Sequence, residues 1–591
     1  MKYIIKIAII IITFTLVSCV DDKPTKIEII DEEPKEPEEP KEPEEPEEPK
    51  EPEEPKIGID AYNDLKTYIN RSASPNFKLG VGVLLNDYTA KGDIYNLLTA
   101  NFDQITLGNE MKQDAVVQAD GSLKLDNITR LIQVANEAGV SIYGHVLVWH
   151  SQQRASYLNS LIDPSLVVGE KGTPLDPSVI TNSDFEADAS GWNSWGNNST
   201  RGRTAAGEGY LGGYAMWFTN PTVAGNAWNA QVAYDFPNPL VVGAKYILNL
   251  HIKATKDGTI SAAMQNPDNY AGAGSFGPIR ITTDWTEVTL ETTITAANAK
   301  RFLFDCGTVD GTIYFDNVTI SRMNPANTDA TRFVQLTEKT STEKNAIITS
   351  EMERWIKGIL EVTQVVKEWD VVNEPMDDGR PNDLKTGVGR TLNANEFYWQ
   401  DYMGKDYAVK AIQFARQYGP PDIKLFINDY NLEYSLNKCR GLIEYVKYVE
   451  SKGVKVDGIG TQMHINTETN RENIVQMFNL LAATGKLIKI TELDMGLRDR
   501  GNVVTTSNAT EELYLQQADL YRFVVEKYFE LIPAPQRYGI TIWSPFDSPD
   551  TQGAWRRNEP IGLWTRDFQR KQAYAGFANG LAGRDVSADK N

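Results

Sequence analysis

Eight short apolar segments alternate with stretches of helical periodicity along this sequence, and they constrain its fold more than any other feature. Between the segments, apolar residues recur three and four positions apart, as in the stretch from Tyr407 to Tyr418. Eight apolar strands that alternate with helices predict an α/β fold, the (β/α)8 TIM barrel. The segments have the length of β-strands and lie at 79–87, 104–112, 141–150, 368–375, 424–431, 456–465, 487–495 and 539–547.

Polar and aromatic residues gather where these predicted strands end. In a (β/α)8 barrel the carboxyl ends of the strands form the active face. Three of the four histidines (His145, His150 and His464) fall in these strands, and Glu374 and Glu492 end the fourth and the seventh. Hydrolysis of a glycosidic bond needs two opposed carboxyl groups, because one donates a proton while the other attacks the sugar or activates water. The sequence therefore predicts a glycoside hydrolase site at Glu374 and Glu492.

Six stretches resemble the motifs of glycoside hydrolase family 10, the endo-β-1,4-xylanases, and follow that family's order. They are GHVLVWHSQ, WDVVNEP, INDYN, GTQMH, ITELDM and AWRRNEPIGLW. The resemblance implies cleavage of xylan or arabinoxylan by a retaining double displacement that needs no cofactor. Glu374 is then the general acid/base and Glu492 the nucleophile. It also implies a raised pKa for Glu374 while Glu492 is ionised, because like charges push their pKa values apart.

The same resemblance implies roles for residues around the two glutamates. Asn373 would hydrogen-bond the sugar 2-hydroxyl, a contact that strengthens in the transition state, and His464 would orient Glu492. Gly108 stands where the family usually has glutamate, so we expect an altered glycone subsite. The other implied substrate-binding residues are Asn109, Lys112, His145, Trp149, Gln152, Tyr430, Gln462, Trp543, Trp555 and Arg556.

The third and fourth predicted strands are separated by far more chain than one helix and two loops need. Within this gap, short runs that alternate apolar and polar residues, such as KYILNLHIKA and TIYFDNVTI, are separated by Gly, Asn, Asp and Thr. This pattern is typical of an antiparallel β-sandwich. We therefore expect an all-β domain at 177–323, inserted into a barrel formed by 57–176 and 324–585. The ends of the insert, TNSDFEADASGWNSW and YFDNVTI, resemble carbohydrate-binding modules of families 4 and 22.

This second resemblance implies that the insert binds a glycan. Trp195, Trp217 and Trp228 lie in polar surroundings and are the predicted sugar contacts. Glu186 and Asp316, near the two ends, are the predicted ligands of a structural Ca2+. Because the insert follows the third strand on the active face, we expect it to extend the substrate groove.

The first residues, MKYIIKIAIIIITFTLVSC, have the pattern of a secretory signal over 1–19. Its end resembles a bacterial lipoprotein cleavage box, which implies a lipid on Cys19; a plain signal peptide is the alternative. Residues 20–56 are rich in Pro and Glu and predict an extended spacer. Asp21-Asp22 resembles the surface-export signal of Bacteroides-type lipoproteins, so we expect a lipid anchor in the outer membrane, facing the exterior.

The net charge and the cysteine content bear on two questions: whether the protein binds nucleic acid and whether disulfides hold its fold together. The formal net charge is -21, but 17 acidic residues and 5 lysines lie between Val20 and Pro55, and the balance argues against a nucleic-acid partner. Cys306 and Cys439 are too few for a disulfide framework, so we expect two free, buried thiols.

Three functions stay open: a xylanase, a β-glucanase of a related barrel, and a non-catalytic surface glycan-binding protein. The presence of both glutamates favours an enzyme, and GHVLVWHSQ and INDYN favour xylan.

Overall fold

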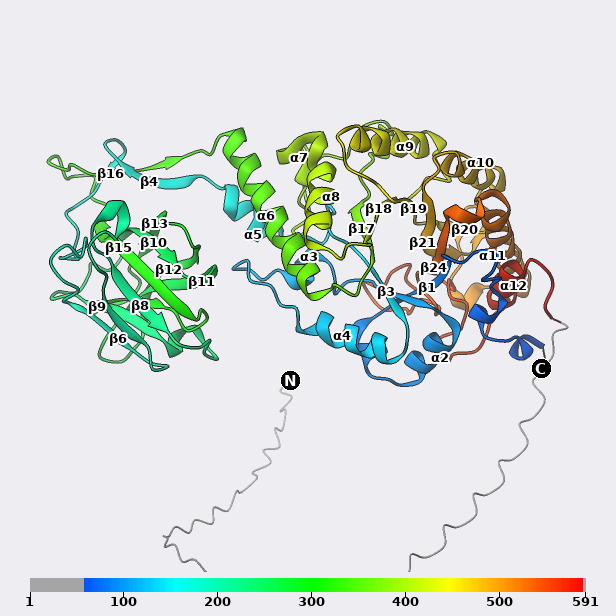
Figure 1. Ribbon diagram of the computed structural model, residues 1–591, viewed down its shortest axis with the longest axis horizontal. Helices are drawn as coiled ribbons and strands as arrows, with labels where there is room; N and C mark the ends of the chain where they lie inside the picture. The colour runs from blue at the N-terminus through cyan, green and yellow to red at the C-terminus, as the bar shows by residue number, and fades with distance from the viewer. Residues whose placement is uncertain (1–57, 588–591) are drawn as a thin grey trace, which may run out of the picture. The chain divides into compact units, whose positions relative to one another are not determined.

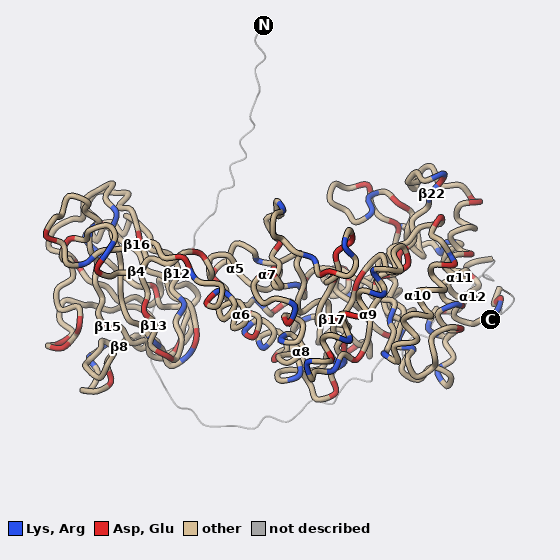
Figure 2. The backbone as a smooth tube through the Cα atoms, turned by 90° about the horizontal axis from the view of Figure 1, so that it is seen from above, with Lys and Arg blue, Asp and Glu red and all other residues tan. Residues whose placement is uncertain are grey.

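The computed structural model describes residues 58–587. The predicted signal segment at 1–19, with Cys19, and the predicted spacer at 20–56 lie outside the described residues. Within the described range, no helix combines the length and the apolar character that crossing a membrane would require. Lys and Arg positions are interspersed with Asp and Glu positions along the described backbone in Figure 2.

Eight parallel strands close into a barrel, which confirms the predicted fold class. Closure is made by the first and last strands, where Leu79 pairs with Ile540. Seven of the eight strands end earlier than the predicted segments because the polar residues there leave the sheet for the loops, whereas β21 ends one residue later. Their bounds are β1 (Lys78–Val83), β2 (Gln104–Leu107), β3 (Ser141–Gly144), β17 (Glu368–Asn373), β18 (Lys424–Asp429), β19 (Gly458–Thr461), β21 (Leu487–Gly496) and β24 (Arg537–Ile542).

Helices surround the barrel strands (Figure 1). The helix predicted after the fourth strand is α8, in which Tyr407, Ala411 and Phe414 are buried and which ends before Gly419. The helices are α1 (Leu85–Thr89), α2 (Asp93–Asn101), α3 (Gln113–Val116), α4 (Asp126–Glu137), α5 (Ala155–Ile162), α6 (Ser341–Val362), α7 (Trp399–Met403), α8 (Tyr407–Tyr418), α9 (Leu436–Ser451), α10 (Arg471–Ala482), α11 (Glu511–Leu531) and α12 (Gln572–Ala582).

Between α5 and α6 the chain forms two five-stranded antiparallel sheets, in the orders β13-β10-β15-β8-β7 and β12-β11-β14-β9-β6. They share one hydrophobic core, to which Leu250 and Phe315 contribute from the first sheet and Ile260 and Phe304 from the second. The strands are β6 (Trp192–Trp195), β7 (Thr200–Arg203), β8 (Met216–Asn220), β9 (Gln231–Asp235), β10 (Lys245–Ala254), β11 (Gly258–Gln265), β12 (Gly272–Ile281), β13 (Thr286–Thr293), β14 (Arg301–Asp305) and β15 (Gly311–Arg322).

Smaller strands complete the described chain. A three-stranded sheet of β4 (Ser165–Gly169), β16 (Phe333–Thr337) and β5 (Thr173–Pro174) is formed by the segments that leave and re-enter the barrel. The others are β20 (His464–Asn466), β22 (Arg498–Asp499) and β23 (Asn502–Val503). Cys306 and Cys439 are both free and buried, as expected.

Candidate active site

The carboxyl ends of the barrel strands surround a cavity of about 630 Å3. Both glutamates line it, so the loops bring residues that are far apart in the sequence to one place. Tyr430 and Arg556 are the two predicted barrel residues that do not line this cavity. The predicted residues that do are Asn109, Lys112, His145, Trp149, Gln152, Asn373, Glu374, Gln462, His464, Glu492, Trp543 and Trp555.

Glu374 follows directly after β17 and has an unusual backbone conformation. Its φ of 51° lies in the left-handed region, which costs a residue with a side chain about 1–3 kcal/mol. The backbone N–H donates to the Asn428 carbonyl at 2.7 Å. Oε1 accepts a hydrogen bond from Gln462 Nε2 at 3.0 Å, and Oε2 lies 3.4 Å from Lys385 Nζ. The backbone and both carboxylate oxygens are thereby fixed.

The electrostatic environment of Glu374 differs from the predicted one. Burial alone would raise the pKa of Glu374, but Lys385, His150 and the hydrogen bond from Gln462 lower that pKa to about 2. The prediction of a raised pKa is therefore wrong for this structure. The reason is a buried ammonium group: a positive charge against a carboxylate favours its ionised form and here outweighs desolvation.

Glu492 lies on β21 between an amide and an imidazole. Oε1 accepts a hydrogen bond from Asn428 Nδ2 at 3.0 Å, and Oε2 lies 3.4 Å from His464 Nε2. The other ring nitrogen of His464 is 3.0 Å from Asp494 Oδ2. Burial alone would lower the pKa of His464, but Asp494 and Glu492 raise that pKa to about 10. His464 is consequently an imidazolium at neutral pH, in contact with Glu492.

Side-chain amides link the two glutamates. Besides its bond to Glu492, Asn428 Nδ2 donates to Asn373 Oδ1 at 2.8 Å. Gln462 Nε2, the donor to Glu374, is also 3.4 Å from Asn373 Oδ1. Asn428 was not among the predicted site residues, although it is the last residue but one of β18 and lies within the INDYN motif. Its position near a strand end was the signal that would have identified it.

A second polar group lines the cavity beside β2. Lys112 Nζ donates to Gln152 Oε1 at 2.6 Å, and Gln152 Nε2 donates to Asn109 Oδ1 at 3.0 Å. The Lys112 ammonium also lies 4.7 Å from the centroid of the Trp149 ring. Gly108 lines the cavity next to this group, and a Cβ added there would meet no atom within 4 Å. The region in which the family's glutamate would stand is open.

Two histidines flank Trp543, and each is held by a buried aspartate. His145 Nδ1 lies 2.9 Å from Asp370 Oδ2, whose other oxygen accepts from the Tyr143 hydroxyl at 2.7 Å. The Trp543 ring centroid is 5.4 Å from that of His145 and 6.3 Å from that of His464. Asp370 thus contacts a histidine, not the cavity.

The ring of Tyr430 faces two lysine ammonium groups and does not line the cavity. Lys438 Nζ lies 3.6 Å and Lys385 Nζ 4.4 Å from its ring centroid, and its hydroxyl donates to Asp378. Two ammonium groups therefore contact the ring that was predicted to bind substrate.

Arg556 stabilises Asp494 from behind the cavity wall. Its Nη1 donates to Asp494 Oδ1 at 2.7 Å, and its Nη2 donates to Glu559 Oε2 at 2.9 Å. Trp555 Nε1 donates to the other Asp494 oxygen at 2.6 Å, while half of the Trp555 residue stays exposed at the cavity. Arg556 therefore acts through Asp494, and Trp555 both anchors and lines the site.

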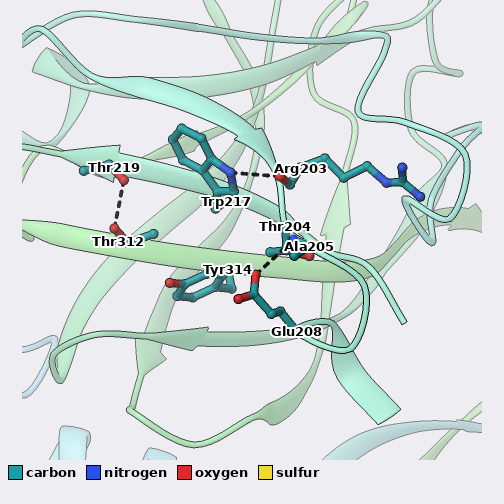
Figure 3. Close-up of a pocket in the computed structure, with 8 residues that line it drawn as sticks. All are labelled: Arg203, Thr204, Ala205, Glu208, Trp217, Thr219, Thr312 and Tyr314. Carbon is teal, nitrogen blue, oxygen red and sulfur yellow. Dashed lines mark hydrogen bonds between the residues drawn. The ribbon is translucent and has the colours of Figure 1, made fainter. Parts of the chain in front are cut away.

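The three tryptophans predicted to bind sugar in the insert lie apart. Trp217 on β8 lines a cavity of about 320 Å3 together with Tyr314 on β15 (Figure 3). Trp195 belongs to the other sheet, where its Nε1 donates to Gln231 Oε1 at 2.8 Å. Trp228 is 64% exposed in a short 3-10 helix. One sheet therefore carries Trp217 without the other two.

The predicted calcium ligands have backbone partners. Glu186 Oε1 accepts from the Tyr214 N–H at 2.9 Å, and Asp316 Oδ2 accepts from the Tyr210 N–H at 2.8 Å. Burial, with the nearby Glu186 charge adding to it, raises the pKa of Asp316 to about 6. Within residues 58–587 no group of three or more His, Cys, Asp or Glu side chains could hold a metal ion. Calcium binding stays a prediction without support from these residues.

A (β/α)8 barrel with one carboxylate directly after its fourth strand and another on its seventh, linked by amides in one cavity, defines a glycoside hydrolase. The family follows from the sequence: residues 68–166 and 329–580 match Glycosyl hydrolase family 10, and the chain belongs to this family. The unmatched residues between these two ranges contain both five-stranded sheets.

Known relatives match part of the chain. It is 35% identical over 213 residues to "Exoglucanase XynX" of Acetivibrio thermocellus, covering 36% of this chain and 17% of that protein. It is 36% identical over 208 residues to "Endo-1,4-beta-xylanase A" of Thermoanaerobacterium saccharolyticum, covering 35% of this chain and 16% of that protein. The matched segment thus spans about one sixth of either relative.

Solved structures share the fold. A GH10 structure from Paenibacillus barcinonensis matches with a TM-score of 0.50 at 20% identity, covering 88% of this chain and 97% of that one. Xylanase B from Clostridium stercorarium F9 matches with a TM-score of 0.51 at 17% identity, covering 88% of this chain and all of that one. At these identities the likeness concerns the fold alone.

Proposed function

We propose that this protein is a retaining endo-β-1,4-xylanase that cleaves internal bonds of xylan or arabinoxylan. One observation carries the proposal: Glu374 and Glu492 line the same cavity in different surroundings, one against Lys385 and the other against the His464 imidazolium. Membership of glycosyl hydrolase family 10 and the name of one relative, an endo-1,4-beta-xylanase, support it.

The reaction has two steps. In the first, a Glu492 oxygen bonds to the anomeric carbon while the bond to the leaving oxygen breaks and that oxygen takes a proton from Glu374. In the second, ionised Glu374 takes a proton from water, whose oxygen displaces Glu492 from the same carbon. Two inversions at one carbon retain its configuration. Both steps use side chains of this chain and water, so no cofactor is required.

The remaining cavity residues suit a neutral sugar chain. Asn373 has its oxygen occupied by Asn428, and its amide nitrogen lies 3.4 Å from Glu374 Oε1. Lys112 and Gln152 offer charged and amide donors on one side, and Trp543 offers an aromatic face to the C–H groups of a pyranose.

Release of reducing sugar from xylan and from mixed-linkage glucan tests this function. We expect faster release from xylan, and Glu492→Ala should abolish it because it removes the carboxylate that forms the covalent intermediate. Faster release from glucan would favour the β-glucanase alternative, which the exoglucanase name of one relative keeps open. No release from either polymer would favour a non-catalytic glycan-binding protein.

We further propose that the insert binds a glycan on the outer face of the sheet that contains β8, β15 and β10. Trp217 pairs with Tyr314, and Tyr314 pairs with Lys253, in one row across the strands. Lys253 Nζ lies 5.1 Å from the Tyr314 ring centroid and 4.8 Å from that of Trp285. Half-buried rings in a row offer stacking surfaces to successive sugars.

The location proposed for the protein is the outer membrane, with a lipid on Cys19 and the barrel facing the exterior. The LVSC sequence at 16–19 and the Pro/Glu-rich residues that follow support it. Labelling of cells with a radioactive fatty acid tests the anchor: wild type should carry the label and Cys19→Ala should not. Equal labelling of both would exclude Cys19 as the lipidated residue.

A further inference from the structure

A buried lysine lies against Glu374 and was not among the predicted site residues. Lys385 is 6% exposed, and its Nζ lies 3.4 Å from Glu374 Oε2. Its backbone is held on both sides: the N–H donates to the Pro375 carbonyl at 2.8 Å, and the carbonyl accepts from Gln400 Nε2 at 2.8 Å. The loop that begins at Glu374, directly after β17, therefore turns back and places the Lys385 ammonium group against the Glu374 carboxylate.

Glu374 is the one ion-pair partner of Lys385 within residues 58–587. The ammonium group also faces the Tyr430 ring and contributes to lowering the pKa of Asp378. A buried ammonium is costly unless a negative charge compensates it. The geometry therefore favours a Glu374 that is ionised whenever Lys385 is in place.

None of the other groups that face Glu374 forms an ion pair with it within residues 58–587. His150, after β3, has its pKa lowered to about 4 by burial and by Lys385, so it is neutral at pH 7. Gln462, after β19, is an uncharged donor, and Lys112, after β2, has its ammonium hydrogen-bonded to Gln152. Asp429 on β18 and Glu492 on β21 are acidic, and the His464 imidazolium is paired with Glu492 and Asp494.

We propose that Lys385 is a positioning residue that holds Glu374 ionised for the second step and thereby sets the upper pH limit of the first. This rests on the proposed acid/base role of Glu374. The first step needs a proton on Glu374, and the second needs the carboxylate to take one from water. A fixed cation 3.4 Å away favours the second state at the expense of the first.

The test is the pH dependence of kcat/KM on a xylo-oligosaccharide, whose leaving sugar needs a proton. In Lys385→Met the alkaline limb should move to higher pH by about 1–3 units, the usual effect of an opposite charge at this range. Lys385→Arg should keep the limb in place. Lys438→Met is the matched control, because Lys438 is a buried lysine that contacts Tyr430 without pairing with Glu374. A limb that stays in place in folded Lys385→Met overturns the proposal.

A second measurement needs no Lys385 variant. A 13C NMR titration of labelled glutamate, with the Glu374 signal assigned from its loss in Glu374→Gln, should place the carboxyl below the ordinary range of glutamate in the wild-type chain. A value within or above that range overturns the proposal even if Lys385→Met does not fold.

A separate experiment distinguishes an error in the acid/base role of Glu374 from an error in the role of Lys385. If Glu374 is the acid/base, Glu374→Ala should lose far more activity on the oligosaccharide than on a dinitrophenyl xylobioside, whose leaving group needs no proton. Equal losses on both would refute the acid/base role itself. Unequal losses together with an unmoved limb in Lys385→Met would refute only the role of Lys385.

Discussion

The barrel cavity and the outer face of the β13-β10-β15-β8-β7 sheet present aromatic rings to solvent in contrasting ways. In the barrel the rings of Trp149 and Trp543 surround buried charges that are paired and hydrogen-bonded. On the sheet, Trp217 and Tyr314 are half-buried over a smaller cavity that contains the carboxylate of Glu208 (Figure 3). Charges act strongly where water is excluded, whereas stacking needs only an accessible face. The difference separates a site built for chemistry from one suited to binding.

The two regions also differ in how their parts depend on one another. In the barrel, Asp494 contacts His464, which contacts Glu492, so a change at one residue alters the next. On the sheet, Trp217 donates only to the Arg203 carbonyl, and its ring contributes through its own surface. We therefore expect large, coupled effects of substitution in the barrel and small, independent effects on the sheet.

The largest effect is expected for Asp494→Asn in the barrel. Asp494 is fully buried and accepts from Trp555 and Arg556 while contacting His464. Removing one charge from such a network costs about 3–5 kcal/mol, because the partner cations are left uncompensated. Urea unfolding of the variant and of Asp550→Asn, which removes an exposed ion pair, should give that difference. Equal free energies of unfolding for the two variants would contradict the expectation that the charges around Asp494 depend on one another.

A smaller effect should follow from pH alone. The pKa of His464 is raised to about 10 in the folded chain, above its ordinary value of 6.5. The stability that this raised pKa contributes is complete below pH 6.5 and is lost as pH rises toward 10, on the order of a few kcal/mol. Denaturant unfolding between pH 6 and 10 should show the loss in wild type, and His464→Gln should show less of it. A parallel decline in both proteins would assign the pH dependence to other groups.

The barrel was predictable because its signals are local. Strand-length apolar runs and helical spacing are properties of neighbouring residues, and strand ends meet at one face whatever the loops do. Glu374 and Glu492 could thus be placed in one site from sequence. Lys385 could not, because its approach to Glu374 depends on the path of a loop that carries no periodicity.

The direction in which a side chain points was the other property that could not be predicted from the sequence. Tyr430 directly follows β18, and its ring could face either the cavity or the loops; the cations of Lys385 and Lys438 fix it away from the cavity. In the insert, strand register decides which tryptophans share a face, and register is set by pairing between distant segments. The prediction of a raised pKa for Glu374 was wrong for the same reason that Lys385 was omitted: a loop whose path the sequence does not reveal brings Lys385 back to Glu374.

An intermediate effect is expected on the sheet. Trp217→Ala removes one stacking ring, and we expect a loss of affinity for insoluble xylan of about 5–30-fold, equivalent to about 1–2 kcal/mol. Depletion assays with the full chain carrying Glu492→Ala measure binding without hydrolysis. Trp228→Ala is the matched control, an exposed tryptophan outside the row. A larger loss for Trp228→Ala than for Trp217→Ala would move the proposed glycan site to another face.

The smallest effect is expected at Gly108, which lines the barrel cavity. This part of the barrel site is open, as the face of the sheet is, so it connects the two regions under comparison. Gly108 has open space where a Cβ would stand and no positive φ, so Gly108→Ala should leave the free energy of unfolding within about 0.5 kcal/mol of wild type. Gly108→Glu places a carboxylate near Lys112 and Asn109, and we expect a lower KM for unsubstituted xylo-oligosaccharides through an added sugar contact. An unchanged KM would mean that the glycone end of the substrate lies away from Gly108, and that the open region serves another part of the polymer.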